Sequence, residues 1–180
     1  MEGDEHPPVL RLGDPALRQR ASEVPESWFG SEDLKALIND LIDTKTARSG
    51  AGLAAPQINA PWRVVVVGMA HNPRYPDAAP VPERVIINPL ITPLSETTIA
   101  GWEGCLSVPG LRGEVARWAN IRMQWRDLQG RCHSEDFSGF EARVMQHECD
   151  HLDGVLFPDR LQSPTAFGFE EELQASGRLP

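Results

Sequence analysis

Residues 139–154 read GFEARVMQHECDHLDG, and this stretch predicts the helix around which the fold is organised. Ser138 and Glu141 have the spacing of a capping box, and Gly154 suits the end of a helix. The apolar side chains of the stretch are Phe140, Val144 and Met145. They share one face at helical spacing, so we expect that face to pack into the core.

The same stretch contains an H-E-x-x-H motif, formed by His147, Glu148 and His151. Positions i and i+4 differ by only about 40° around a helix, so both imidazoles leave one face and can bind one metal ion. A bound metal lowers the pKa of its water from about 15.7 to about 7. Glu148 lies beside that face and can take the proton and pass it to a leaving group. The motif predicts a metal-dependent hydrolase with metal-bound water as the nucleophile and Glu148 as the general acid/base.

A catalytic site of this kind needs a third protein ligand and keeps one position open for water. Zinc peptidases of one large class take a downstream glutamate, and three glutamates stand at residues 170–172. The alternative is Cys105, because a thiolate in the stretch EGCLS could also reach the metal. A closed, purely structural site would need Cys149, which lies about 200° around the helix from His147. The residues alone leave the first two candidates open.

The stretch GAGLAAPQ, at residues 50–57, is rich in glycine and alanine. Glycine permits another backbone to approach closely, and Gln57 offers an uncharged amide donor of the kind that stabilises an oxyanion. A helix end followed by a tight connection would also account for the glycines, although not for the whole stretch.

The remaining elements predict an α+β fold, with mainly antiparallel β-sheets packed around the central metal-binding helix. A second, N-terminal helix is expected over residues 33–48, with Ser31 as its N-cap and Gly50 at its end. Aliphatic and β-branched runs predict strands at 63–67, 85–91, 121–126 and 132–137. Four prolines indicate a surface loop at 71–82, and residues 127–130 suit a turn between antiparallel strands.

The composition indicates a single globular domain over residues 1–180 that stays in the cytoplasm. The net charge of -9 argues against a general nucleic-acid-binding surface. Three irregularly spaced cysteines do not suit a disulfide framework and indicate a reducing compartment. The acidic N-terminus is neither a signal nor a transit peptide, and the aliphatic run at 64–67 is too short to span a membrane.

Together, three stretches resemble the motifs of the peptide deformylases. That family is marked by G-x-G-L-A-A-x-Q, E-G-C-L-S and Q-H-E-x-D-H segments, and all three stand here in order, at residues 50–57, 103–107 and 146–151. The flanking sequence is also similar, so that the resemblance covers residues 9–161. It implies removal of the formyl group from N-formylmethionine at the start of new polypeptides.

The resemblance also implies roles for individual residues. The implied metal ligands are Cys105, His147 and His151. Glu148 would be the general acid/base, while Gln57 and the backbone N–H of Leu106 would hold the oxyanion. One divalent ion is expected, with Fe²⁺ in cells and Zn²⁺, Ni²⁺ or Co²⁺ as replacements on purification, because two imidazoles and a thiolate suit all four.

The expected substrate is an N-formylmethionyl peptide, which would pair as an added strand with the backbone near three glycines. These glycines are Gly50, Gly52 and Gly104. The methionine pocket would involve Ala51, Glu103, Arg112 and Val144, and Glu103 and Arg112 are expected to form an ion pair. Some deformylases contact the ribosome through a long basic C-terminal helix. The short tail here is acidic at residues 170–172, which argues against that mode of transient ribosome contact.

The main competing hypothesis is an endopeptidase whose third metal ligand is a glutamate near Glu171. It predicts that Cys105→Ala keeps metal and activity while Glu171→Ala loses both. A deformylase should show the reverse.

Overall fold

The computed structural model describes residues 5–73 and 76–179 of the chain. The fold is α+β with antiparallel sheets, as the sequence predicts. One sheet has five strands in the order β1-β2-β3-β6-β7, and the other has three in the order β4-β5-β8. The strands are β1 Gly52–Ala54, β2 Val64–Met69, β3 Val81–Pro93, β4 Thr98–Cys105, β5 Val108–Trp118, β6 Asn120–Arg126, β7 Cys132–Ser138 and β8 Phe167–Phe169.

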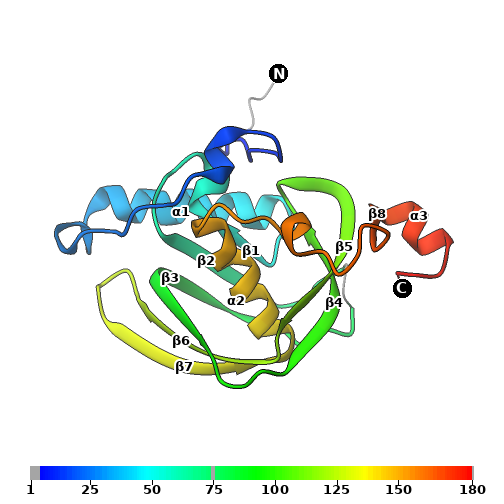
Figure 1. The fold of residues 1–180 in the computed structure, drawn as a ribbon. Coiled ribbons are helices and arrows are strands. Elements are labelled where there is room, and N and C mark those ends of the chain that lie inside the picture. Colours follow the sequence, from blue (N-terminus) through cyan, green and yellow to red (C-terminus); the bar gives the residue numbers. More distant parts are fainter. Residues whose placement is uncertain (1–4, 74–75, 180) are drawn as a thin grey trace.

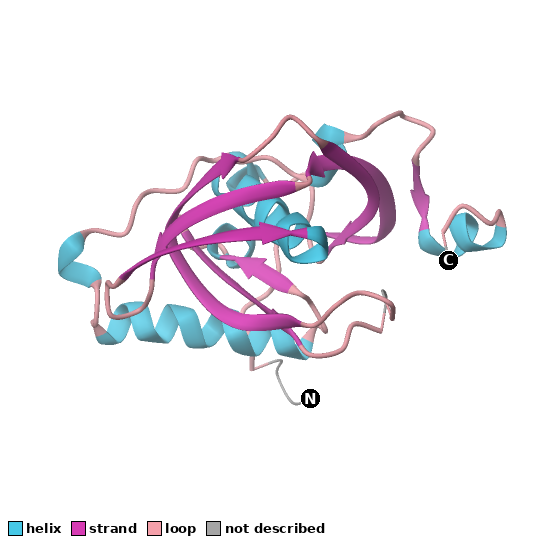
Figure 2. Ribbon diagram, turned by 90° about the horizontal axis from the view of Figure 1, so that it is seen from below, coloured by secondary structure: helices cyan, strands magenta, loops and turns pink. Residues whose placement is uncertain are grey.

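The α-helices are α1 Glu32–Ala47, α2 Gly139–Leu152 and α3 Glu170–Ala175. Short 3-10 turns are η1 Pro15–Arg18, η2 Glu26–Trp28, η3 Ala55–Ile58 and η4 Phe157–Arg160. In Figure 1, α2 lies at the centre of the molecule among the strands, while α1 runs along the outside of the larger sheet. In Figure 2 the strands curve around the central helix, and the C-terminal helix stands at the outer edge. No helix in the described ranges is both long and apolar enough to cross a membrane.

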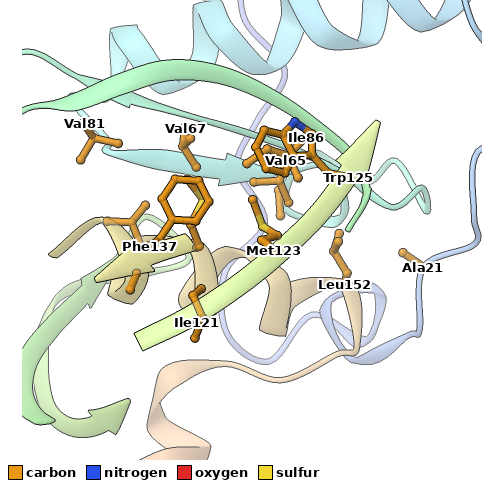
Figure 3. Close-up of a cluster of buried hydrophobic side chains, with 14 residues drawn as sticks. Ala21, Val65, Val67, Val81, Ile86, Ile121, Met123, Trp125, Phe137 and Leu152 are labelled. Atoms are coloured by element: carbon orange, nitrogen blue, oxygen red, sulfur yellow. The ribbon is translucent and has the colours of Figure 1, made fainter. Parts of the chain in front are cut away.

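The valine run of β2 is buried on both sides because helices cover both faces of the larger sheet. Side chains alternate along a strand, so Val65 and Val67 join the cluster around α2, while Val64 and Val66 join the cluster under α1. Figure 3 shows Val65 and Val67 facing Met123 across the first cluster. Burying one such side chain is worth about 1.5–3 kcal/mol. The resulting dense core holds α2 in place.

The element boundaries agree with most of the sequence predictions. The Ser31 hydroxyl accepts a hydrogen bond of 3.2 Å from Leu34 N and caps α1. All four predicted strands are present, and β6 and β7 pair across the predicted turn. The predicted loop was too long at its end, because β3 already begins at Val81. Two positions of that loop, 74 and 75, lie outside the described residues.

The predicted capping box of α2 is wrong. The Ser138 side chain makes no capping hydrogen bond. The Glu141 carboxylate instead accepts a hydrogen bond of 2.6 Å from Arg84 on β3. This ion pair between Glu141 and Arg84 therefore joins the start of α2 to the larger sheet. Strands β1, β4, β5 and β8 were not predicted, and β4 and β5 carry much of the site.

Candidate metal centre and active site

Three buried side chains from two elements form a cluster that fits a metal ion. They are Cys105 at the end of β4 and His147 and His151 on α2, and their ligand atoms lie within 4.8 Å of one another. Cys105 Sγ lies 3.4 Å from Nε2 of His151. Two such ligands of one tetrahedral ion, with bonds of about 2.3 and 2.0–2.1 Å, would be about 3.5 Å apart. The donor set and its spacing therefore suit one divalent transition-metal ion.

The alternative ligands lie elsewhere. Glu170, the first of the three tail glutamates, accepts a hydrogen bond of 3.1 Å from Arg112. The metal-competent group found among the described residues contains none of these glutamates. Cys149 is also outside that group and lines a second cavity together with Asp150, as its position around the helix predicted. The structure thus brings the thiol of Cys105 to the histidines.

A buried carboxylate fixes the orientation of the first histidine. Glu103 Oε1 lies 2.8 Å from Nδ1 of His147, which leaves Nε2 for a metal. The same carboxylate accepts hydrogen bonds of 2.8 and 2.9 Å from Arg117 and of 2.7 Å from Arg143. Burial alone would raise the pKa of Glu103, but hydrogen bonds from Arg117 and His147 outweigh it and hold that pKa well below its usual range. Glu103 is therefore an anion that orients the His147 ring.

The predicted ion pair between Glu103 and Arg112 is wrong. Both side chains come from the smaller sheet, but Glu103 is bound by Arg117 and Arg143. Arg112 pairs instead with Glu170, at the start of α3. Arg112 does not line the cavity beside the metal-competent cluster. Sequence spacing could not reveal this exchange, because Arg112 and Arg117 both lie on β5 while Arg143 comes from α2.

Glu148 stands beside the cluster with one carboxylate oxygen free. Its Oε1 lies 4.0 Å from Nε2 of His147, and no hydrogen-bond partner is found for Oε2 among the described residues. Burial is the main cause that raises the pKa of Glu148, to about 7. A Cβ added at Gly52 would lie 2.7 Å from Cγ of Glu148. The glycine of β1 therefore leaves just enough space for a carboxyl group able to exchange protons.

Gln57 is held in η3 with its amide directed toward the cluster. Its Oε1 accepts a hydrogen bond of 2.9 Å from Ala54 N, which fixes the orientation of the amide. The Nε2 group donates to Ser107 Oγ at 3.0 Å and lies 3.6 Å from Cys105 Sγ. An immobile, buried N–H donor is thus placed next to the metal-competent cluster.

A cavity opens beside these groups, between β1 and β4. Both strands are at the edges of their sheets, so both have backbone groups available on this side. The cavity is lined by the following predicted residues: Gly50, Ala51, Gly52, Gln57, Glu103, Gly104, Cys105, Leu106, Val144, His147 and Glu148. It is also lined by residues that the sequence did not assign to the site: Ser49, Asn72, Trp102, Phe140 and Arg143. Trp102 precedes Glu103 in the sequence, and Arg143 precedes Val144. This adjacency to predicted site residues is the sequence signal that could have identified Trp102 and Arg143 as lining the cavity.

Comparisons with known proteins agree with this geometry. The sequence model of the polypeptide deformylase family matches residues 7–166. Peptide deformylase 1 of Nitrosomonas europaea is 50% identical over 166 residues, which are 92% of this chain and 93% of that protein. The peptide deformylase of Leptospira biflexa is 49% identical over 172 residues, covering 95% and 96% of the two chains.

Solved structures show the same similarity. The class I type b peptide deformylase of Acinetobacter baumannii, crystallised with Met-Ala-Ser bound, superposes with a TM-score of 0.84 at 40% identity. The match covers 87% of this chain and 98% of that one. The peptide deformylase of Thermotoga maritima gives a TM-score of 0.76 at 35% identity, covering 88% and 99%.

Proposed function

The chain belongs to the polypeptide deformylase family, and from that premise we propose which of its residues perform the reaction. The enzyme is a hydrolase that removes the formyl group from the N-terminal formylmethionine of polypeptides. We propose that residues 1–180 act as one catalytic domain. The observation that carries the assignment of roles is the meeting of Cys105, His147 and His151 beside Glu148 and Gln57.

Cys105, His147 and His151 would hold one divalent ion. We propose Fe²⁺ in cells, with Zn²⁺, Ni²⁺ or Co²⁺ as replacements in purified protein, because the same ligands accept all four. The ion would supply a Lewis acid that activates water and polarises the formyl carbonyl. Glu103 would keep His147 in the tautomer that presents Nε2 to the ion.

Glu148 would move the protons. Its carboxylate takes a proton from the attacking water as the oxygen bonds to the formyl carbon. It then delivers that proton to the amine nitrogen of methionine as the C–N bond breaks. The products are formate and a peptide with a free amino terminus. The free oxygen of Glu148 at the cavity supports this role.

Gln57 and the backbone N–H of Leu106 would stabilise the oxygen of the formyl group as it gains negative charge. Gln57 is fixed by its bond to Ala54, so its amide needs little reorganisation during the reaction. Leu106 follows Cys105 directly and lines the same cavity. Both N–H donors, from Gln57 and Leu106, would therefore reach the formyl oxygen from the side on which Cys105 lies.

The peptide would bind as an added strand between β1 and β4, next to Gly50, Gly52 and Gly104. The Acinetobacter baumannii relative has been crystallised with Met-Ala-Ser, a peptide of the expected product type. The methionine side chain would lie against Ala51, Glu103 and Val144, with the newly identified Trp102 and Phe140 completing the wall. Arg112 would contribute only indirectly, from behind Gly104.

The enzyme would act in the cytoplasm on nascent chains. Residues 167–175 form the short strand β8, which pairs with β5, and the short helix α3, rather than a long basic helix. Any contact with the ribosome would therefore be transient and use another surface.

Release of formate from formyl-Met-Ala-Ser, with metal content measured in parallel, tests the proposal. We expect turnover that depends on the bound metal. A folded, metal-loaded sample that releases no formate would contradict the assignment.

A further inference from the structure

The C-terminal segment, residues 167–179, is connected through β5 to β4, the strand that carries two site residues. Its strand β8 pairs with β5, with Arg112 opposite Gly168. Strand β5 pairs in turn with β4, which contains Glu103 and Cys105. Figure 1 shows β8 and α3 at the outer side of these strands, away from α2. The segment is thus placed to support β4 from the side opposite the metal-competent cluster.

One contact reaches a residue that lines the substrate cavity. The guanidinium carbon of Arg178 lies 5.5 Å from the ring centroid of Trp102, within the range of a cation–π interaction. Arg178 also donates a hydrogen bond to the carbonyl of Thr165. Trp102 is half-buried and lines the cavity between β1 and β4. Arg178 therefore restricts the position of one wall residue without itself lining the cavity.

A second contact supports the backbone of β4. The Arg112 side chain is buried, and a Cβ added at Gly104 would lie 2.4 Å from its Nη1. Glu170 holds the other end of this guanidinium at 3.1 Å. Arg112 therefore fills the space between α3 and the Gly104 backbone, which is part of the proposed peptide-binding edge.

We propose that residues 167–179 position the β4 edge for peptide binding, with Arg178 as a positioning residue that acts through Trp102. The inference rests on the proposed function, since β4 matters in this way only if the peptide binds along it. The side-chain contacts of Arg178 in the described part of the chain are with Trp102 and Thr165, and neither of these is a proposed metal ligand or the proposed proton carrier. Loss of Arg178 should therefore weaken binding of the peptide and leave the chemical step nearly unchanged.

The test compares KM and kcat for formyl-Met-Ala-Ser in Arg178→Ala, Arg178→Lys and the wild type. Loss of an exposed cation–π contact should raise KM by about two- to fivefold, with kcat within about twofold. Arg178→Lys keeps a cation over the ring and should recover most of the affinity. If Arg178→Ala folds poorly, Arg178→Gln retains a long side chain without the charge and provides the same measurement.

A double-mutant cycle separates this role from a general loss of stability. In a Trp102→Leu background, Arg178→Ala should raise KM no further, because the contact has already been removed. Arg122→Ala is the matched control, since it breaks an arginine–aspartate pair of 2.8 Å on β6 and β7, in the other sheet. It should leave KM unchanged.

An unchanged KM in Arg178→Ala, or an equal rise in the Trp102→Leu background, would overturn the inference. An equal rise in Arg122→Ala would also overturn it. These outcomes differ from failure of the proposed function, which would appear as absence of formate release from metal-loaded wild-type enzyme.

Discussion

Glu103 Oε1 and His147 Nδ1 are 2.8 Å apart, and this hydrogen bond connects β4 to the metal-competent face of α2. Arg117 and Arg143 hold the same carboxylate, so its position is set by both sheet and helix. Cys105 lies two residues further along the same strand. One short segment of β4 therefore supplies both a proposed metal ligand and the group that orients another proposed ligand.

Glu103→Gln should weaken metal binding by about 10- to 100-fold, the usual cost of losing such an orienting partner. It should also lower the melting temperature, because the buried guanidinium of Arg117 and the half-buried one of Arg143 lose their anion. Metal titration and thermal unfolding measure the two effects. Glu135→Gln, at an exposed partner of Arg84, is the control and should change neither. Unaltered metal affinity in Glu103→Gln would show that the hydrogen bond does not orient the ligand.

Glu148→Gln should keep the metal and lose turnover by about 10²- to 10⁴-fold. The amide has nearly the same shape, but it cannot accept and return a proton. Formate release and metal content in the same sample provide the measurement. Turnover close to the wild-type value would remove Glu148 from the proposed mechanism.

Gly52→Ala should reduce turnover by about 100-fold while the metal remains bound. The added methyl group would meet Cγ of Glu148 at 2.7 Å, so the carboxylate must move. Gly168→Ala is a suitable control for kcat at saturating substrate, because its added methyl group would make only ordinary contacts of 3.6–4.0 Å with Leu173 and its segment is proposed to affect KM rather than kcat. Equal activity of the two variants would mean that Glu148 tolerates displacement.

Cys105→Ala should lose both metal and activity, whereas Glu171→Ala should retain both. The reason is the burial of Cys105 within 4.8 Å of the two histidine ligand atoms, while the metal-competent group found in the described part of the chain includes no tail glutamate. Metal analysis after dialysis and formate release distinguish the two variants. The opposite result would favour the endopeptidase hypothesis.

Removal of the metal should lower the melting temperature. At a free metal concentration about 1,000 times Kd, binding contributes about 4 kcal/mol, which corresponds to about 8–16 °C in a protein of this size. Thermal unfolding with and without a chelator measures the shift. The shift should nearly disappear in Cys105→Ala, and a full shift in that variant would place the metal elsewhere.

Local sequence signals were enough to predict the two main helices. Apolar spacing and the Ser31 cap defined α1, and helical periodicity with Gly154 defined α2. The relative placement of His147 and His151 follows from the helix pitch alone. The ordered motifs at residues 50–57, 103–107 and 146–151 identified the family before any contact was known, and the comparisons confirmed it.

Which distant groups meet could be seen only in the folded chain. Strands β4 and β5 escaped prediction because Gly101, Gly104, Pro109, Gly110 and Gly113 interrupt their alternation, and pairing between strands compensates for this. Spacing along the chain could not choose between Arg112, Arg117 and Arg143 as partners of Glu103. Nor could it show that Arg178 packs on Trp102. These contacts join residues that are far apart in the sequence and depend on long-range packing. At Glu103 the burial of the charge also matters, because its desolvation must be compensated by partners.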